Sequence, residues 1–310
     1  MRLLSAVGIV ATCLLLITPA WAEDGILEER LAQAAEAEYS AEQLVVCWTP
    51  VGEVAGVYGV QQGGGMLLLS HGGSEAMLAG TEVINRVPGE GWRRVELRVP
   101  SMPALSARYR VEVGRTETYL GRPVQPVEVW EEDLLRVRFV FDAQTSVPLV
   151  TTVFAGDGSP FRMSSFTRFS TRGPKLVLPA GGPKRSVESA QPASLPKEAA
   201  GYELTDAYQG PHDGVHAYYT DGLFSFSVFE ISGLVDPGSL PDTTELAVTG
   251  RTYRMRVMPS ELWVLWSGEG HSYLLVGDLP PDHLEAVLGE LPAPRSDGLL
   301  SRLRRAVFGG

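Results

Sequence analysis

The sequence predicts an α+β protein that consists mainly of antiparallel β-sheet and has two domains. Short segments rich in branched and aromatic apolar residues recur between turn residues along most of the chain, which is typical of antiparallel strands. Few segments have the apolar spacing of a helix. A stretch rich in proline interrupts the strand pattern after residue 171, and a length of 310 residues suits two domains.

Residues 1–22 have the features of a secretory signal peptide. Arg2 precedes an apolar run from Leu3 to Ile17, and a small-residue cleavage site ends at Ala22. The apolar run is too short for a comfortable membrane span. We therefore expect cleavage between Ala22 and Glu23 and a soluble mature chain in the periplasm or another extracytoplasmic space; an uncleaved anchor is the alternative.

Cysteine usage agrees with this expectation but adds no crosslink. Cys13 lies inside the predicted signal peptide, where Thr12 departs from a lipoprotein box, so cleavage leaves Cys47 alone. A single cysteine cannot form an intramolecular disulfide, although export leads to a compartment that permits one. Cys47 lies in an apolar segment and is predicted to be a buried core residue.

Residues 23–171 are predicted to form the first domain. Asp24 can cap a helix in which Ile26, Leu27 and Leu31 lie on one face and which ends near Tyr39. Segments with strand composition follow at Leu44–Trp48, Gly56–Val60, Met66–Ser70, Trp92–Val99, Arg108–Val113, Val127–Trp130, Leu135–Phe141, Leu149–Phe154 and Phe161–Phe169. The Leu135–Phe141 segment alternates apolar residues with Arg, which predicts one solvent-exposed face.

An open sheet with a helix over one face commonly encloses an apolar cleft. Aromatic and methionine side chains are plentiful enough in the first domain to line one, although filling of the core is the alternative. The candidates are Trp48, Tyr58, Met66, Trp92 and Trp130.

Residues 172–198 contain five prolines among Gly, Ala and Ser, and are predicted to be a semi-extended linker. Residues 199–291 form the second predicted domain, with a helix that starts at the Pro280-Pro281 pair. Its predicted strands are Gly214–Thr220, Leu223–Ile231, Leu246–Val248, Arg251–Met258, Leu262–Trp266 and Ser272–Val276. Residues 292–310 form a basic tail that either docks on a domain or contacts a membrane.

The net charge of −11 is distributed unevenly along the chain. Residues 23–171 carry −7 and residues 201–291 carry −11, whereas residues 172–200 and 292–310 each carry +3. A strongly acidic domain repels nucleic-acid phosphates, so we expect no nucleic-acid partner.

Candidate catalytic and metal-binding patterns each have a better structural explanation. His212 and His216 have helical spacing for a metal pair, but the glycine between them argues against a helix. Ser74 lies in a sequence close to a hydrolase elbow, and turn formation explains its glycines better. The adjacent acids from Glu131 to Asp133 are predicted to form a solvated turn. We therefore expect no enzyme, no cofactor and no metal.

Three motifs resemble those of the MucB/RseB-type periplasmic regulators of extracytoplasmic-function sigma factors. Segment 219–229 resembles the family's Y-x-D-G-L-x-x-x-S-V-F signature, segment 273–281 resembles its V-V-G-E-V-P-P junction, and segment 121–149 resembles the end of its N-terminal domain. The motif residues, which mark a candidate partner-binding region, are Tyr219, Asp221, Gly222, Leu223, Val228, Phe229, Gly277, Pro280 and Pro281. Residues 40–90 and the insertion Gly233–Thr244 depart from the family pattern.

The resemblance implies a first domain that is a half-open barrel, as in lipoprotein carriers, and a smaller second domain. It also implies a partner, the extracytoplasmic part of a single-span anti-sigma factor, which the protein would shield from proteolysis until an envelope-stress signal such as a lipid releases it. The alternative function is a periplasmic lipid or lipoprotein carrier that uses the cleft of the first domain.

Overall fold

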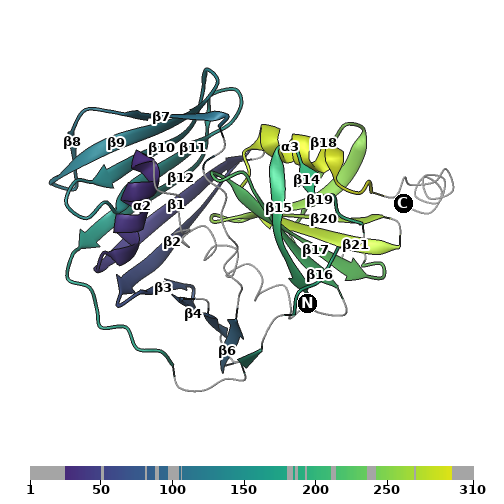
Figure 1. The fold of residues 1–310 in the computed structure, drawn as a ribbon, viewed down its shortest axis with the longest axis horizontal. Coiled ribbons are helices and arrows are strands. Elements are labelled where there is room, and N and C mark those ends of the chain that lie inside the picture. Colours follow the sequence, from purple (N-terminus) through teal and green to yellow (C-terminus); the bar gives the residue numbers. More distant parts are fainter. Residues whose placement is uncertain are drawn as a thin grey trace.

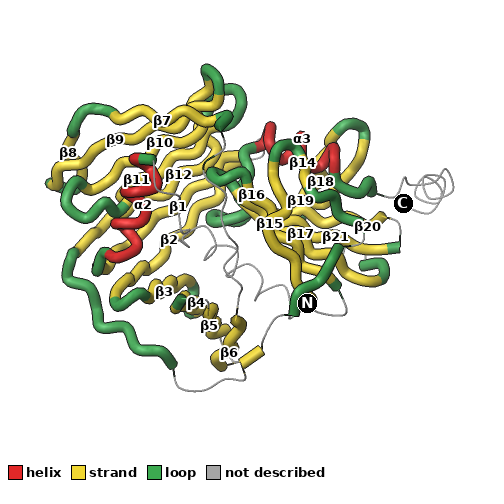
Figure 2. The backbone as a smooth tube through the Cα atoms, in the orientation of Figure 1, coloured by secondary structure: helices red, strands yellow, loops and turns green. Residues whose placement is uncertain are grey.

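The computed structural model describes residues 25–49, 52–80, 82–87, 91–96, 105, 107–179, 184–185, 188–192, 194–210, 214–235, 242–268 and 270–294. These residues form two β-sheets of 13 and 8 strands that lie side by side (Figure 1). Helix in the described parts is confined to two short segments (Figure 2). The predicted α+β class with predominantly antiparallel sheet is confirmed. The Ala22–Glu23 cleavage site and residues 295–310 of the basic tail lie outside the described residues.

The first sheet is an antiparallel meander with one parallel pair, β13 with β6. Its strand order is β13-β6-β5-β4-β3-β2-β1-β12-β11-β10-β9-β7, with β8 also pairing with β9, so that β13 and β7 are the edges of a sheet that does not close on itself in the described residues. The strands are β1 (Tyr39–Thr49), β2 (Gly52–Gly63), β3 (Met66–His71), β4 (Ser74–Ala79), β5 (Glu82–Val87), β6 (Gly91–Glu96), β7 (Tyr109–Val113), β8 (Glu117–Tyr119), β9 (Arg122–Glu131), β10 (Leu134–Asp142), β11 (Pro148–Phe154), β12 (Pro160–Ser170) and β13 (Lys184–Arg185).

Helix α2 (Ile26–Glu36) lies across the curved first sheet (Figure 1). The Leu27 and Ala34 side chains of this helix are buried. The Gln62 side chain of β2 donates hydrogen bonds to the carbonyl oxygens of Ala34 and Ala35 at 2.7 and 2.6 Å. The helix ends at Glu36, three residues before the predicted end near Tyr39. Tyr39 already begins β1, because its backbone pairs with β2 in the sheet.

The second sheet contains the strands from Glu198 onward, in the order β14-β15-β16-β17-β21-β20-β19-β18. Helix α3 (Pro281–Glu290) begins with proline in its first turn and packs Val287 and Leu288 into a core that includes Trp266. The strands are β14 (Glu198–Ala199), β15 (Tyr202–Gln209), β16 (Val215–Thr220), β17 (Ser225–Ser232), β18 (Thr244–Val248), β19 (Arg251–Val257), β20 (Leu262–Gly268) and β21 (His271–Gly277).

Several strands escaped the sequence prediction, among them β4, β5 and β15. β4 begins directly after Gly72 and Gly73, which have φ of 55° and 82° and connect the paired residues His71 and Ser74. Left-handed backbone at both positions is what a two-residue hairpin turn requires. The expectation of a turn at these glycines is therefore confirmed, and Ser74 begins a strand.

Candidate functional site

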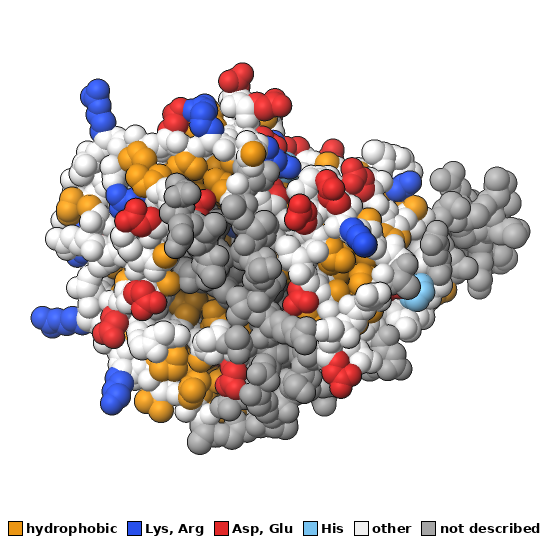
Figure 3. Space-filling model, viewed as in Figure 1, with side chains coloured by type: hydrophobic (Ala, Val, Ile, Leu, Met, Phe, Trp, Pro, Cys, Tyr) orange, Lys and Arg blue, Asp and Glu red, His pale blue; other side chains and the backbone are white. Residues whose placement is uncertain are grey.

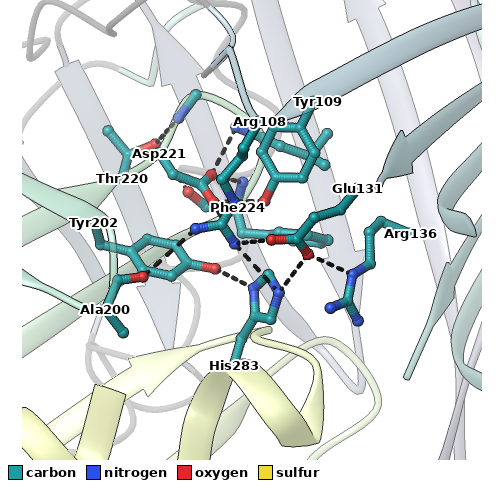
Figure 4. A network of polar contacts seen from close by, with 12 residues as sticks. Arg108, Tyr109, Glu131, Arg136, Ala200, Tyr202, Thr220, Asp221, Phe224 and His283 are labelled. Atoms are coloured by element: carbon teal, nitrogen blue, oxygen red, sulfur yellow. Dashed lines mark hydrogen bonds and ion pairs between the residues drawn. The ribbon is translucent and has the colours of Figure 1, made fainter. Parts of the chain in front are cut away.

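Polar side chains from the two sheets converge where the sheets meet (Figure 4). The first sheet supplies the residues at the start of β7, the end of β9 and the start of β10. The second sheet supplies the turn after β16 and the first turn of α3. Two of the three sequence motifs, those at 219–229 and 273–281, therefore lead directly into this contact.

The turn after β16 is organised by Asp221. Its Oδ1 accepts hydrogen bonds from the backbone N–H groups of Leu223 and Phe224 at 2.9 and 2.8 Å, while Gly222 has a φ of 89° that favours glycine. Its Oδ2 accepts a hydrogen bond from the Tyr109 hydroxyl of the first sheet at 2.6 Å (Figure 4). The same carboxylate thus shapes its own turn and contacts the opposite sheet.

Burial and the neighbouring Asp221 carboxylate hold the pKa of the Tyr109 phenol well above its usual range. Tyr109 therefore remains a hydrogen-bond donor at every pH at which the protein would function. The guanidinium of Arg108 lies 3.6 Å from Asp221 Oδ2 and stacks over the Tyr109 ring with its Cζ 5.0 Å from the ring centroid. Arg108 therefore contacts both members of the Tyr109–Asp221 hydrogen bond, the carboxylate of Asp221 and the ring of Tyr109.

His283, in the first turn of α3, joins the two sheets through both ring nitrogens. Nε2 lies 3.1 Å from Glu131 Oε2 of the first sheet, and Nδ1 lies 2.7 Å from the Tyr202 hydroxyl of β15. Burial and Arg136 lower the pKa of His283, and the nearby carboxylates of Glu131 and Asp282 only partly oppose them. The imidazole is therefore neutral at neutral pH.

Glu131 is the acceptor at the centre of this cluster. Its Oε1 lies 2.9 Å from Arg108 Nη2, and its Oε2 accepts a hydrogen bond from Arg136 Nε at 2.6 Å. Burial by itself would raise the pKa of Glu131, but Arg108, His283 and Arg136 together lower it. The prediction of a solvated acidic turn holds for the exposed Glu132 and Asp133 and is wrong for Glu131.

A second carboxylate, that of Asp282 in α3, extends the contact. Asp282 Oδ2 lies 2.8 Å from Arg136 Nη1, and its Oδ1 accepts the backbone N–H of Gly156 at 2.9 Å. Arg136 is only 5% exposed, so the prediction that the Arg side chains of β10 face solvent is wrong at this position. The first turn of α3, which packs on the second sheet, contacts Arg136 through Asp282.

The remaining motif residues support this arrangement from inside the second sheet. Tyr219 stacks on Phe226 with ring centroids 4.9 Å apart, and its hydroxyl donates to the carbonyl oxygen of Pro196. Gly277 pairs with Phe226, and a Cβ at Gly277 would lie 2.8 Å from the Phe226 Cβ. Val228 is buried in the same core, Phe229 packs on the opposite face of the sheet, and Pro280 and Pro281 turn the chain from β21 into α3.

The structure does not gather the five candidate cleft residues into one site. Pairing places Tyr58 opposite Gln43 and Trp48 opposite Glu53, so Tyr58 and Trp48 point to opposite faces of the first sheet. Met66 follows the β2–β3 turn, where Leu67 rather than Met66 faces the core beneath α2. Trp92 on β6 and Trp130 on β9 lie far apart in the strand order. Tyr58 lies near Ser260 and Glu261, which precede β20 of the second sheet.

The histidine motif takes no part in a metal site among the described residues, where no metal-binding group of three or more side chains is found. His212 lies outside them. His216 is buried on β16, stacks on Phe229 at 4.1 Å and lies with Nε2 2.7 Å from the Ser227 hydroxyl. Burial lowers the pKa of His216 to about 3, which makes it too weak a base to activate that serine at neutral pH.

Sequence reasoning missed the residues that complete this contact, which are Arg108, Tyr109, Glu131, Arg136, Tyr202 and His283. None of them is among the named motif residues, although Glu131 and Arg136 lie within segment 121–149, and contacts such as His283 with Glu131 join residues 152 positions apart. One available signal was Arg136 within an apolar strand, since a charged side chain that faces a core needs a partner.

The sequence and the fold were compared with those of known proteins. No family model matches the sequence, and no match is found among curated proteins. The described architecture matches the crystal structure of MucB with a TM-score of 0.50 and 18% identity, covering 86% of this chain and 98% of that one.

Two other solved structures are more distant. The complex of MucA and MucB from Pseudomonas aeruginosa gives a TM-score of 0.47 at 18% identity and covers 87% of this chain and 98% of that one. A LolA-superfamily protein from Nitrosomonas europaea gives 0.21 at 10% identity, with coverages of 84% and 97%. The match to the MucB structure at a TM-score of 0.50 confirms the resemblance seen in the motifs at the level of the fold: this chain is built like MucB.

Proposed function

We propose that this protein is an exported, non-catalytic binding protein that holds the extracytoplasmic part of a single-span anti-sigma factor and so restrains a sigma-factor stress response. The observation that carries the proposal is the joint occurrence of the MucB fold and the family motifs, two of which lead into the contact between the sheets. MucB has been crystallised with the periplasmic part of MucA. Export is supported by the signal-peptide features of residues 1–22.

The kind of partner follows from charge. Residues 201–291 carry 14 acidic and 3 basic residues, and acidic side chains are visible over the second sheet on the face shown in Figure 3. A partner segment that contacts this sheet should be basic or apolar. Charges at the rim of an interface mainly steer association, so the affinity should fall as salt rises.

The test uses the mature chain and the purified extracytoplasmic segment of the single-span anti-sigma factor encoded in the same genome. We expect saturable binding, a weaker affinity at 500 mM than at 50 mM salt, and protection of the segment from its site-specific protease. An affinity that does not change with salt concentration would contradict the electrostatic part of the proposal. Absence of both binding and protection would overturn the proposed function.

We also propose that an acyl ligand binds the first sheet and acts as the release signal. This proposal is supported by the first sheet, which is open in the described residues and is crossed by a single described helix. A lipid or lipoprotein carrier, the alternative function, would require the same arrangement. Native mass spectrometry of the purified protein with a short-chain phospholipid should show a bound adduct that lowers affinity for the anti-sigma segment. A protein that binds the lipid equally well without residues 199–310 and never binds the segment would be a carrier.

A further inference from the structure

A second group of buried charges lies between the sheets, apart from the His283 cluster. Arg162 of β12 and Asp278, which follows β21, are 6% and 9% exposed, and Arg162 Nη1 lies 3.3 Å from Asp278 Oδ2. Glu261, at the start of β20, is 1% exposed. The arginine comes from the first sheet and both carboxyl groups come from the second.

The loop that carries Glu261 rests against the first sheet. A Cβ at Gly56 of β2 would lie 3.0 Å from the Cγ of Pro259, so the Pro259 ring packs closely on the backbone of β2. Ser260, in the same loop, lies close enough to Tyr58 of β2 to oppose the rise in the pKa of the Tyr58 phenol that burial causes. Separation of the two sheets at this point would therefore bring water to Glu261.

The charges in this group do not balance. Two carboxyl groups face one guanidinium, and ionised carboxylates are costly to bury unless each is paired and hydrogen-bonded. Glu261 Oε1 accepts a hydrogen bond from Trp263 Nε1 at 2.9 Å, whereas Oε2 of Glu261 and Oδ1 of Asp278 have no hydrogen-bond partner among the described residues. The arrangement is most stable when one carboxyl group keeps its proton.

We propose that closure of the two sheets is proton-linked through Glu261: its protonated carboxyl group is compatible with the closed contact, and its ionisation favours opening. Among the described residues no strand pairing joins the two sheets, so their separation would break side-chain contacts but no sheet hydrogen bonds. This inference concerns the protein without its partner and does not depend on the proposed function.

The titration behaviour of the surrounding groups agrees with this assignment. Burial raises the pKa of Glu261 to about 8, with Asp278 acting in the same direction and Trp263 and Arg162 opposing it. From the first sheet, Tyr58 and Cys47 face the same group, and burial raises the pKa of each, so they remain neutral near neutral pH. Burial also raises the pKa of Asp278, but Asp278 Oδ2 is ion-paired with Arg162 at 3.3 Å, whereas Glu261 is hydrogen-bonded only to the neutral Trp263. The geometry therefore assigns the retained proton to Glu261.

The direction of the effect follows from proton binding. In the opened state Glu261 has its ordinary pKa near 4.5, so between about 4.5 and 8 the closed state binds more protons than the opened one. Rising pH therefore weakens closure across this interval. The limit for one proton is about a tenfold rise in the opening constant per pH unit.

Hydrogen exchange read by mass spectrometry, corrected for intrinsic rates, measures opening constants even when the open state is rare. For segment 258–266 of the full mature chain, we expect a rise approaching tenfold per pH unit between pH 6 and 7.5. Glu261→Gln keeps the shape and the bond from Trp263 and should show less than a twofold change. Glu285→Gln, an exposed change on α3, should behave like the wild type.

Equal pH dependence in the wild type and Glu261→Gln would overturn the proposal, as would a pH-independent wild type. If Glu261→Gln does not fold, infrared titration of the wild type still decides the matter. A protonated carboxyl band that disappears with a midpoint near 8 supports the assignment. A spectrum without such a band between pH 6 and 9 contradicts it.

Discussion

At the scale of single residues, the hydrogen bond from Tyr109 to Asp221 is the clearest contribution to the contact between the sheets. The hydroxyl donates at 2.6 Å to a buried carboxylate, and a hydrogen bond to a charged group typically contributes about 1.5–3 kcal/mol. We expect Tyr109→Phe to lower the free energy of unfolding by about this amount, because Asp221 Oδ2 loses its donor. Urea denaturation at pH 7 measures the change.

Tyr119→Phe is the matched control for this prediction. The Tyr119 hydroxyl donates at 2.8 Å to the backbone carbonyl of Phe166, so both partners lie within the first sheet and neither is charged. Its loss should be about 0.5–1.5 kcal/mol. A Tyr119→Phe variant that is less stable than Tyr109→Phe would contradict the special role of the contact with Asp221.

At the scale of elements, the pairing of β17 with β21 depends on the glycine that ends β21. A Cβ at Gly277 would lie 2.8 Å from the Phe226 Cβ and 3.0 Å from the Ser225 carbonyl oxygen. Overpacking of this kind typically costs about 1–3 kcal/mol. We expect Gly277→Ala to lower the thermal midpoint measured by circular dichroism, and to displace the start of α3 with it.

Gly289→Ala provides a test with the same chemical change in an open place. Gly289 lies on the exposed face of α3, and a Cβ there meets nothing within 4 Å. Alanine favours the helix by about 1 kcal/mol over glycine. A raised midpoint for Gly289→Ala beside a lowered one for Gly277→Ala would confirm that packing, and not the substitution itself, decides the outcome.

At the scale of the whole molecule, the junction between the sheets makes stability depend on pH in the acid range. The native pKa of His283 is lowered from 6.5, so the unfolded chain binds a proton that the native chain does not. Its contribution is therefore present above about pH 6.5 and is lost as pH falls below that value. We expect His283 by itself to lower the denaturant midpoint at pH 5 relative to pH 7. Glu261 responds to pH in the opposite direction, so the contribution of His283 is read from the difference between the wild type and a His283 variant.

His283→Gln should reduce this difference between pH 5 and pH 7, since glutamine can still hydrogen-bond to Tyr202 and Glu131 without taking up a proton. His71→Gln, at an exposed position of the first sheet, should retain the response of the wild type. An unchanged pH dependence in His283→Gln would assign the acid effect to other groups.

Much of the fold could be predicted because strands and turns leave local signals. The alternation of Leu135–Phe141, the glycine pair at Gly72 and Gly73 and the proline start of α3 are all visible within a few residues. Strand β15 escaped because Tyr202–Gln209 mixes polar and apolar residues with little periodicity, and pairing with β16 decides its conformation.

The sequence by itself determined where most of the strands, turns and helices form, how charge divides along the chain, and which motifs resemble a known family, since each is a property of neighbouring residues. Only the tertiary structure decided what those motifs contact. Asp221 meets Tyr109 across 112 positions and His283 meets Glu131 across 152, and no local pattern specifies such a partner. Burial then changes the chemistry of these side chains, because a pKa depends on surroundings that form only when the two sheets come together.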